Sequence, residues 1–166
     1  MPATIISLAG QYLLQPILNT MANFYSTGEK KEFNKIVFRA LLLIVAFGVL
    51  CLLGAYVLGI PVLNILYSVD ISDYKTHLLI IIFGAVLYSM STLLSAALTT
   101  VRYTFVQFIV FGISSIIAFF LSRFLIVQYS IYGAAISYLI TMTCQFGLYV
   151  IIYFVIMKKI DFKEVV

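Results

Sequence analysis

Five long apolar stretches occupy almost the whole chain, and each has the length of a helix that crosses a membrane. They cover residues 4–25, 35–58, 77–100, 104–128 and 131–157. A bilayer's hydrocarbon core is about 30 Å thick and needs about 20 mostly apolar helical residues to span it. Only 10% of the residues are charged, against roughly 25% in soluble domains. The pattern predicts an all-α, polytopic membrane bundle of about five transmembrane helices, forming a single domain over residues 1–166.

Short polar or turn-forming segments separate these stretches. The first break, "STGEKKEFNK", is charged and contains Gly28, and the second, "GIPVLNILYSVDISDYK", contains Gly59 and Pro61. The last two breaks, "VRYT" and "YSIYG", are short enough to be tight turns, with Gly133 starting the final helix. We therefore expect helices that follow one another directly, in alternating directions.

Basic residues are distributed unequally between the two sides of the expected bundle. One side holds Lys75 and Arg123. The other side holds Lys30, Lys31, Lys35, Arg39, Arg102, Lys158, Lys159 and Lys163. By the positive-inside rule, the side rich in Lys and Arg is cytoplasmic. We expect the N-terminus outside, the C-terminus in the cytoplasm, and a multi-pass protein of the cell membrane.

The first apolar stretch contains an unusual polar stripe. Polar residues recur at every fourth position, at Ser7, Gln11, Gln15, Asn19 and Asn23. Residues four apart lie nearly above one another on a helix, so the stripe winds slowly along one face. The amides could hydrogen-bond across a helix interface, or they could line a water-filled path that meets a polar ligand. Pro16 falls within the stripe, where it predicts a kink.

Two further positions are candidates for a substrate path. Gln145, near the middle of the last stretch, follows Ser137, Tyr138 and Thr141 at helical spacing, which fits either helix packing or a second polar face. Apart from Lys35 and Arg39 at the start of the second stretch, Arg123 is the one cation within a stretch, about a turn and a half from its outer end. Its side chain could reach the membrane surface or line a cavity that attracts anions.

Residue sets for catalysis are missing from the sequence. All six carboxylates lie in the predicted loops or the tail, at Glu29, Glu32, Asp70, Asp73, Asp161 and Glu164. No intramembrane acid is present to bind a coupling proton or sodium ion. His77 is the only histidine, and Cys51 and Cys144 lie in apolar runs. We expect that the protein is not an enzyme and that it binds no metal and no cofactor. Because the net charge of +4 comes without a basic tail, we expect no nucleic-acid partner either.

The order of these features resembles the C-terminal lobe of bacterial polysaccharide flippases, in the multidrug/oligosaccharidyl-lipid/polysaccharide exporter (MATE-like) superfamily. The similarity rests on a Pro-containing polar helix followed by three short motifs. The matching residues are Gly28, Glu29 and Phe33 in the first motif, Pro61, Leu63, Leu66 and Tyr67 in the second, and Gly133, Ala134, Ala135 and Ile136 in the third. Ser68 stands where that family usually has Gly, and family members have two six-helix lobes, of which this chain would supply about five helices.

The resemblance implies a transporter that moves undecaprenyl-diphosphate-linked oligosaccharide across the bacterial cell membrane for polysaccharide export. In that interpretation the amides of the polar stripe face a central cavity and contact sugar hydroxyls, Pro16 bends the helix, and Arg123 helps to hold the diphosphate. The partners would be the lipid-linked oligosaccharide, the bilayer, and a second lobe or partner subunit. Two other interpretations remain open: a fragment of a cation-coupled drug exporter, and a non-transporting membrane interaction protein or truncated remnant.

Overall fold

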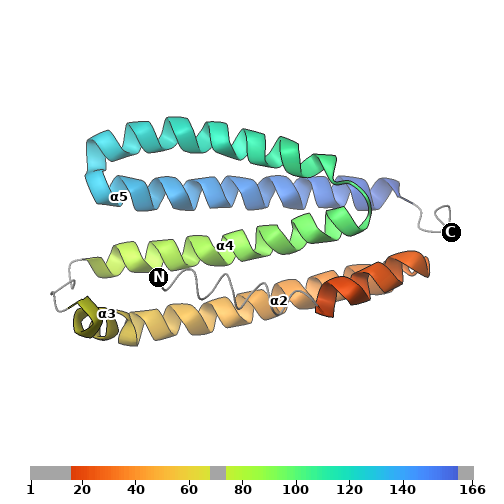
Figure 1. The fold of residues 1–166 in the computed structure, drawn as a ribbon, viewed down its shortest axis with the longest axis horizontal. Helices are drawn as coiled ribbons and strands as arrows, with labels where there is room; N and C mark the ends of the chain where they lie inside the picture. The colour runs from red at the N-terminus through yellow and green to blue at the C-terminus, as the bar shows by residue number, and fades with distance from the viewer. Residues whose placement is uncertain (1–15, 68–73, 161–166) are drawn as a thin grey trace.

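The computed structural model describes residues 16–67 and 74–160, and all regular elements within these ranges are helices. Residues 16–26 are helical and lead into α2 (Lys30–Gly54), a π-helical turn η1 (Ala55–Gly59), α3 (Ile60–Tyr67), α4 (Lys75–Thr100) and α5 (Phe105–Lys159). The long helices lie side by side in an elongated bundle (Figure 1).

Three described segments are long and apolar enough to cross a membrane: Lys30–Val62, Lys75–Thr100 and Phe105–Lys159. Large apolar side chains cover their outer faces, among them Phe38, Phe105 and Phe154, each more than 60% exposed. A soluble protein rarely exposes so much contiguous apolar surface, whereas lipid covers it without cost. The prediction of an all-helical protein suited to a membrane is thus confirmed for the described residues. The count of five spans stays a prediction.

Helix α5 contains a reversal of direction. Ser130 has φ 51° and ψ −125°, and on either side of it the chain is helical. Figure 1 shows two limbs side by side, which we call the first limb (105–129) and the second limb (131–159). A Cβ atom at Gly133 would collide with the carbonyl oxygen of Leu125, so glycine lets the second limb start against the end of the first. The tight turn expected at "YSIYG" is confirmed.

Two other turns connect consecutive helices through residues with positive φ. Gly28 has φ 75°, and the Glu29 N–H donates to the Phe24 carbonyl at 3.0 Å. Arg102 has φ 68° in the "VRYT" turn, where the Tyr103 N–H donates to the Leu98 carbonyl at 3.0 Å. Both follow the Schellman pattern, in which one left-handed residue ends a helix and the next N–H bonds back across it.

The helical structure continues beyond Leu58, where the sequence pattern places a break. It passes through η1 and Pro61 to the end of α3. Proline normally clashes with the carbonyl one turn earlier in an α-helix. Here the π-helical turn, which is wider than an α-helical one, ends at Gly59, two residues before Pro61, and can accommodate the ring at the cost of a bend. Figure 1 shows α3 turned away from the axis of α2.

Because the chain reverses direction at the turns, its charged residues lie at the two ends of the bundle. The start of α2, the α4–α5 turn and the end of α5 lie at one end, on the right of Figure 1. We call this the basic end, because its residues include Lys30, Lys31, Lys35, Arg102, Lys158 and Lys159. The Lys30 Nζ donates to the Ile160 carbonyl at 2.6 Å, which joins the start of α2 to the end of α5. Lys75 lies at the opposite end, at the start of α4.

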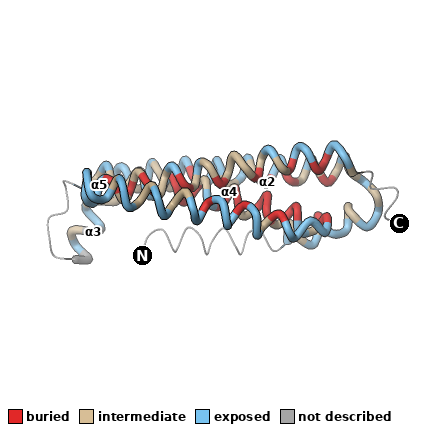
Figure 2. The backbone as a smooth tube through the Cα atoms, turned by 90° about the horizontal axis from the view of Figure 1, so that it is seen from above, coloured by how far each residue is buried: buried red, intermediate tan, exposed pale blue. Residues whose placement is uncertain are grey.

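The core lies along the facing sides of α2, α4 and α5, where buried residues concentrate in Figure 2. Its side chains come from every long helix. The largest fully buried ones include Met21, Phe33, Leu93, Leu98 and Tyr149. The outer sides are exposed and the inner sides are packed, so the bundle has one interior, formed mainly by α4 with its neighbours on both sides.

Candidate functional site

The helix of residues 16–26 presents two different faces. Met21 is fully buried, and Ile17 and Leu18 pack against the core cluster. Asn19 and Asn23 are exposed. The apolar face thus holds this helix to the rest of the bundle, and the amide face points outward from the chain. We call the exposed pair Asn19 and Asn23 the amide face.

The amide face makes no side-chain hydrogen bond to another helix among the described residues. The hydrogen bonds at Asn23 are made by its backbone carbonyl, which accepts from the Thr27 N–H at 3.0 Å, from Ser26 Oγ at 2.8 Å and from Thr27 Oγ1 at 3.1 Å. Gln11 and Gln15 lie outside the described residues. Pro16 is the first residue described, so the kink expected there stays a prediction.

A second set of polar residues follows one face of the second limb of α5. Ser137, Thr141 and Gln145 are 5%, 6% and 4% exposed. The hydroxyls are satisfied within their own helix, because Ser137 Oγ donates to the Ala134 carbonyl at 2.9 Å and Thr141 Oγ1 donates to the Ser137 carbonyl at 2.8 Å. We call Ser137, Thr141 and Gln145 the buried stripe.

The buried stripe extends further than the sequence analysis proposed. Tyr149 and Tyr153 continue its four-residue spacing, and both are buried. The Tyr153 hydroxyl donates to Oδ1 of Asn34 on α2 at 2.7 Å, so the stripe ends in a bond between two helices. The same four-residue periodicity could have identified both tyrosines from the sequence. No pattern in the sequence around Asn34 predicts that it bonds to this stripe.

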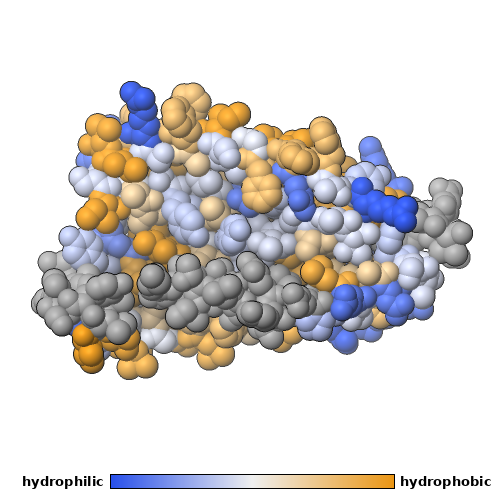
Figure 3. Space-filling view, in the orientation of Figure 1, coloured by the Kyte–Doolittle hydropathy of each residue, from blue (hydrophilic) through white to orange (hydrophobic). Residues whose placement is uncertain are grey.

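A hollow of about 520 Å³ opens between the two limbs of α5. Hydroxyl-bearing and small side chains make up most of its wall. The lining residues are Ser115, Ala118, Phe119, Ser122, Ser137, Tyr138, Thr141 and Met142. Figure 3 shows weakly hydrophilic side chains, pale in colour, across the middle of the viewed face, with hydrophobic ones above and below and strongly hydrophilic ones toward the right end. The hollow can accept or donate hydrogen bonds but has no charged group in its wall.

The structure does not bring the remaining candidates together. Arg123 is exposed and follows Ser122, a residue of the hollow's wall, on the first limb. Gln145 lies on the second limb and further from the reversal at Ser130, so the two differ in depth by about 12 Å at about 1.5 Å of rise per residue. The amide face is near the basic end, because Asn23 lies just before the turn at Gly28. The candidates therefore occupy three separate places along the bundle.

The chemistry available at these places is hydrogen bonding by neutral groups. No set of three or more metal-ligating side chains occurs within residues 16–67 and 74–160. The ion pair found in that part of the chain joins Lys35 and Glu32 at 3.2 Å on the surface of α2, away from the hollow. Amides and hydroxyls can bind hydroxyl-rich or phosphate-bearing molecules without adding charge to the membrane interior.

Fold and site together define a helical membrane protein with an amide face directed away from its own core. Comparisons of the chain with protein-family models, with curated proteins and with solved structures found no match. The function is therefore argued from the geometry and chemistry of the chain itself.

Proposed function

We propose that this chain is part of a transporter that flips undecaprenyl-diphosphate-linked oligosaccharide across the bacterial cell membrane. The observation that carries the proposal is the exposed amide face of Asn19 and Asn23. A helix that only packed would turn its amides inward or pair them with a neighbouring helix. Amides turned away from the core need water, a polar ligand or a second protein surface, because hydrocarbon cannot satisfy them.

In this proposal the chain forms five transmembrane helices of a MATE-like lobe. Helix α5 counts as two spans, because its 55 residues would extend about 80 Å as a straight helix, whereas a bilayer core is about 30 Å thick. Each limb alone has sufficient length. The basic end faces the cytoplasm by the positive-inside rule, which puts the C-terminus inside and the N-terminus outside.

The amide face would line the cavity between this lobe and a second lobe or partner subunit. Gln11, Gln15, Asn19 and Asn23 would contact the sugar hydroxyls as the two lobes alternate between inward and outward openings. Pro16 would provide the bend in that helix. Arg123 lies near the end of the bundle opposite the basic end, so it would contact the cargo only when the cargo is at the outer side of the membrane. Gln145 would contribute to helix packing behind the cavity.

The test replaces the amide face in a bacterium that produces this chain, by introducing Asn19→Leu together with Asn23→Leu at the chromosomal locus. We expect surface polysaccharide to fall at least about tenfold and the lipid-linked oligosaccharide to accumulate, because each lost pair of hydrogen bonds is worth a kcal/mol or more. Immunoblotting of membranes should show an unchanged amount of the chain. Thr143→Leu is the matched control, since Thr143 is exposed on α5 and donates to its own backbone.

Normal export by the double variant would reject the proposal. Loss of a membrane complex without accumulation of lipid-linked oligosaccharide would instead favour a non-transporting interaction protein. Accumulation of a toxic cation inside the cells, with normal polysaccharide, would favour a drug exporter.

A further inference from the structure

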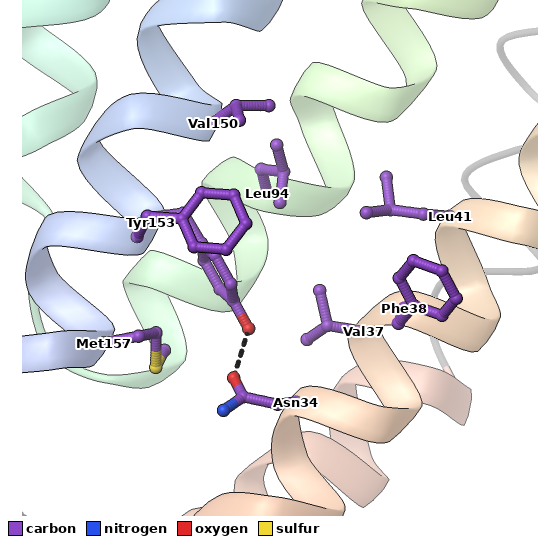
Figure 4. Close-up of a pocket in the computed structure, with 9 residues that line it drawn as sticks. Asn34, Val37, Phe38, Leu41, Leu94, Val150, Tyr153 and Met157 are labelled. Atoms are coloured by element: carbon purple, nitrogen blue, oxygen red, sulfur yellow. Dashed lines mark hydrogen bonds between the residues drawn. The ribbon is translucent and has the colours of Figure 1, made fainter.

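A second hollow lies between α2, α4 and the second limb of α5, close to the basic end. Its volume is about 420 Å³, within the range of about 300–1,000 Å³ for ligand sites. Val37 and Leu94, each 2% exposed, close its inner side. Phe38 and Phe154, 67% and 69% exposed, flank its outer side. Figure 4 shows Val37 and Leu41 on α2 facing Val150 and Tyr153 on α5, with Leu94 of α4 between them. The hollow is thus apolar and opens toward the outer surface of the bundle.

The polar groups of this hollow lie together at one end. The Tyr153 hydroxyl donates to Asn34 Oδ1 at 2.7 Å, as the dashed line in Figure 4 shows. This bond uses the amide oxygen and leaves the Asn34 NH₂ group as a hydrogen-bond donor. A molecule in the hollow would therefore meet hydrocarbon along most of its length and one amide donor at the end nearest the basic residues.

Basic side chains flank that same end on both helices. Lys31 lies one turn before Asn34 on α2, and Lys158 directly follows Met157, a residue of the hollow's wall. Residues three or four apart on a helix share a face, so Lys31 lies above the wall formed by α2. The bond from Lys30 to the Ile160 carbonyl crosses between the same two helices.

Acidic residues do little to cancel this charge. Among the described residues at this end, the acids are Glu29 and Glu32, and Glu32 pairs with Lys35 at 3.2 Å on the exposed surface of α2. Lys31 and Lys158 are themselves exposed. The end of the hollow therefore combines an amide donor with a net positive charge.

We propose that this hollow binds one acyl chain of an anionic phospholipid, whose phosphate lies between Lys31 and Lys158. The apolar wall selects a hydrocarbon chain, and the lysines select a headgroup with net negative charge over a zwitterionic one. Asn34 donates to an ester or phosphate oxygen. The occupant comes from the leaflet at the basic end, and no residue of the amide face lines the hollow. The inference does not depend on the proposed transport activity.

The test uses the absence of tryptophan from the chain. Phe154→Trp places a single fluorophore at the wall of the hollow, and the full chain is reconstituted in phosphatidylcholine vesicles containing 10 mol% of a brominated lipid. We expect stronger quenching by brominated phosphatidylglycerol than by brominated phosphatidylcholine. Each lysine near a membrane surface contributes about a fivefold preference for anionic lipid, so Lys31→Gln together with Lys158→Gln should remove the difference.

Three matched variants separate the site from general surface charge. Lys75→Gln removes a basic residue at the opposite end and should leave the preference unchanged. Phe119→Trp places the fluorophore on the first limb, where the two brominated lipids should quench equally. Val150→Phe fills the hollow but keeps both lysines, and it should abolish the preference while circular dichroism shows unchanged helix content.

The proposal is overturned if the two brominated lipids quench equally at the hollow, or if the preference survives the lysine pair. Survival in the folded Val150→Phe variant also overturns it, because surface charge alone would then explain the preference. Displacement of the brominated lipid only by a polyprenyl diphosphate, and not by excess unlabelled phosphatidylglycerol, overturns it in favour of a cargo site.

Discussion

The amide face and the buried stripe have the same four-residue spacing but opposite surroundings. Asn19 and Asn23 are exposed and unbonded to other described helices, whereas Ser137 and Thr141 are buried and bonded to carbonyls of their own helix. A hydroxyl can satisfy its donor on the preceding turn. A carboxamide has two donors and an acceptor, which one turn of its own helix cannot satisfy. Gln145, a carboxamide of the buried stripe, is nevertheless only 4% exposed. The comparison teaches that neither the spacing nor the type of polar group alone decides which stripe is buried; the helices that cover each face do.

The largest expected effect comes from disrupting the fold that buries the second stripe. Gly133→Ala puts a methyl group against the Leu125 carbonyl, so the second limb can no longer pack against the first. We expect a loss of at least about 3 kcal/mol in the free energy of unfolding, at the upper end for overpacking. Denaturant titration in detergent, followed by circular dichroism, measures it.

Gly112→Ala is the matched control for that variant. It lies on the first limb, where an added Cβ meets nothing within 4 Å. Its stability should stay equal or rise slightly, because alanine is the better helix former. Equal stability of the two variants would show that the reversal does not depend on the close approach at Gly133.

An intermediate effect is expected in a chemical comparison of the two stripes. In a background with Cys51→Ala and Cys144→Ala, single cysteines are introduced by Asn19→Cys, Asn23→Cys, Thr141→Cys and Gln145→Cys. A membrane-impermeant maleimide should label the first two positions at least about tenfold faster than the last two, because the thiolate must meet water to react. Similar labelling rates at all four positions would contradict the claim that the amide face contacts water while the buried stripe does not.

The smallest expected effect concerns the backbone at the reversal. Ser130 has φ 51° and ψ −125°, a conformation that costs a non-glycine residue about 1–3 kcal/mol. Ser130→Gly should raise the free energy of unfolding by about 1 kcal/mol, after subtraction of the greater chain entropy of glycine. Ser115→Gly, in regular helix on the first limb, should lower it by about 0.5 kcal/mol. A loss of stability in both variants would contradict the strain at Ser130.

Much of the fold could be predicted from the sequence, because apolar length and turn residues are local signals. The turns at Gly28, at Arg102 and before Gly133 all occur where short polar or turn-forming segments interrupt the apolar stretches. The region around Pro61 differs, because whether a proline breaks a helix depends on the geometry of the turn before it. The π-helical turn Ala55–Gly59 supplies that geometry. The residue types in "AYVLG" do not predict a π-helical turn.

The candidate sites were less predictable than the helices. Spacing identified Asn19, Asn23 and Gln145 as polar positions on helix faces, but it could not tell an outward face from an inward one. That difference depends on which neighbours cover each helix, and those neighbours are distant in sequence. Asn34 is the clearest example, because its role follows from Tyr153, which is 119 residues away.

The bond between Lys30 and Ile160 has a consequence for biosynthesis. The two residues are separated by 130 positions. Nearly the entire described chain must therefore be translated before this hydrogen bond can form. The helices that precede Ile160 in the chain can therefore enter the bilayer before this bond forms. A truncation before Ile160 removes this bond between α2 and the end of α5, so the truncated chain should be degraded faster by quality-control proteases.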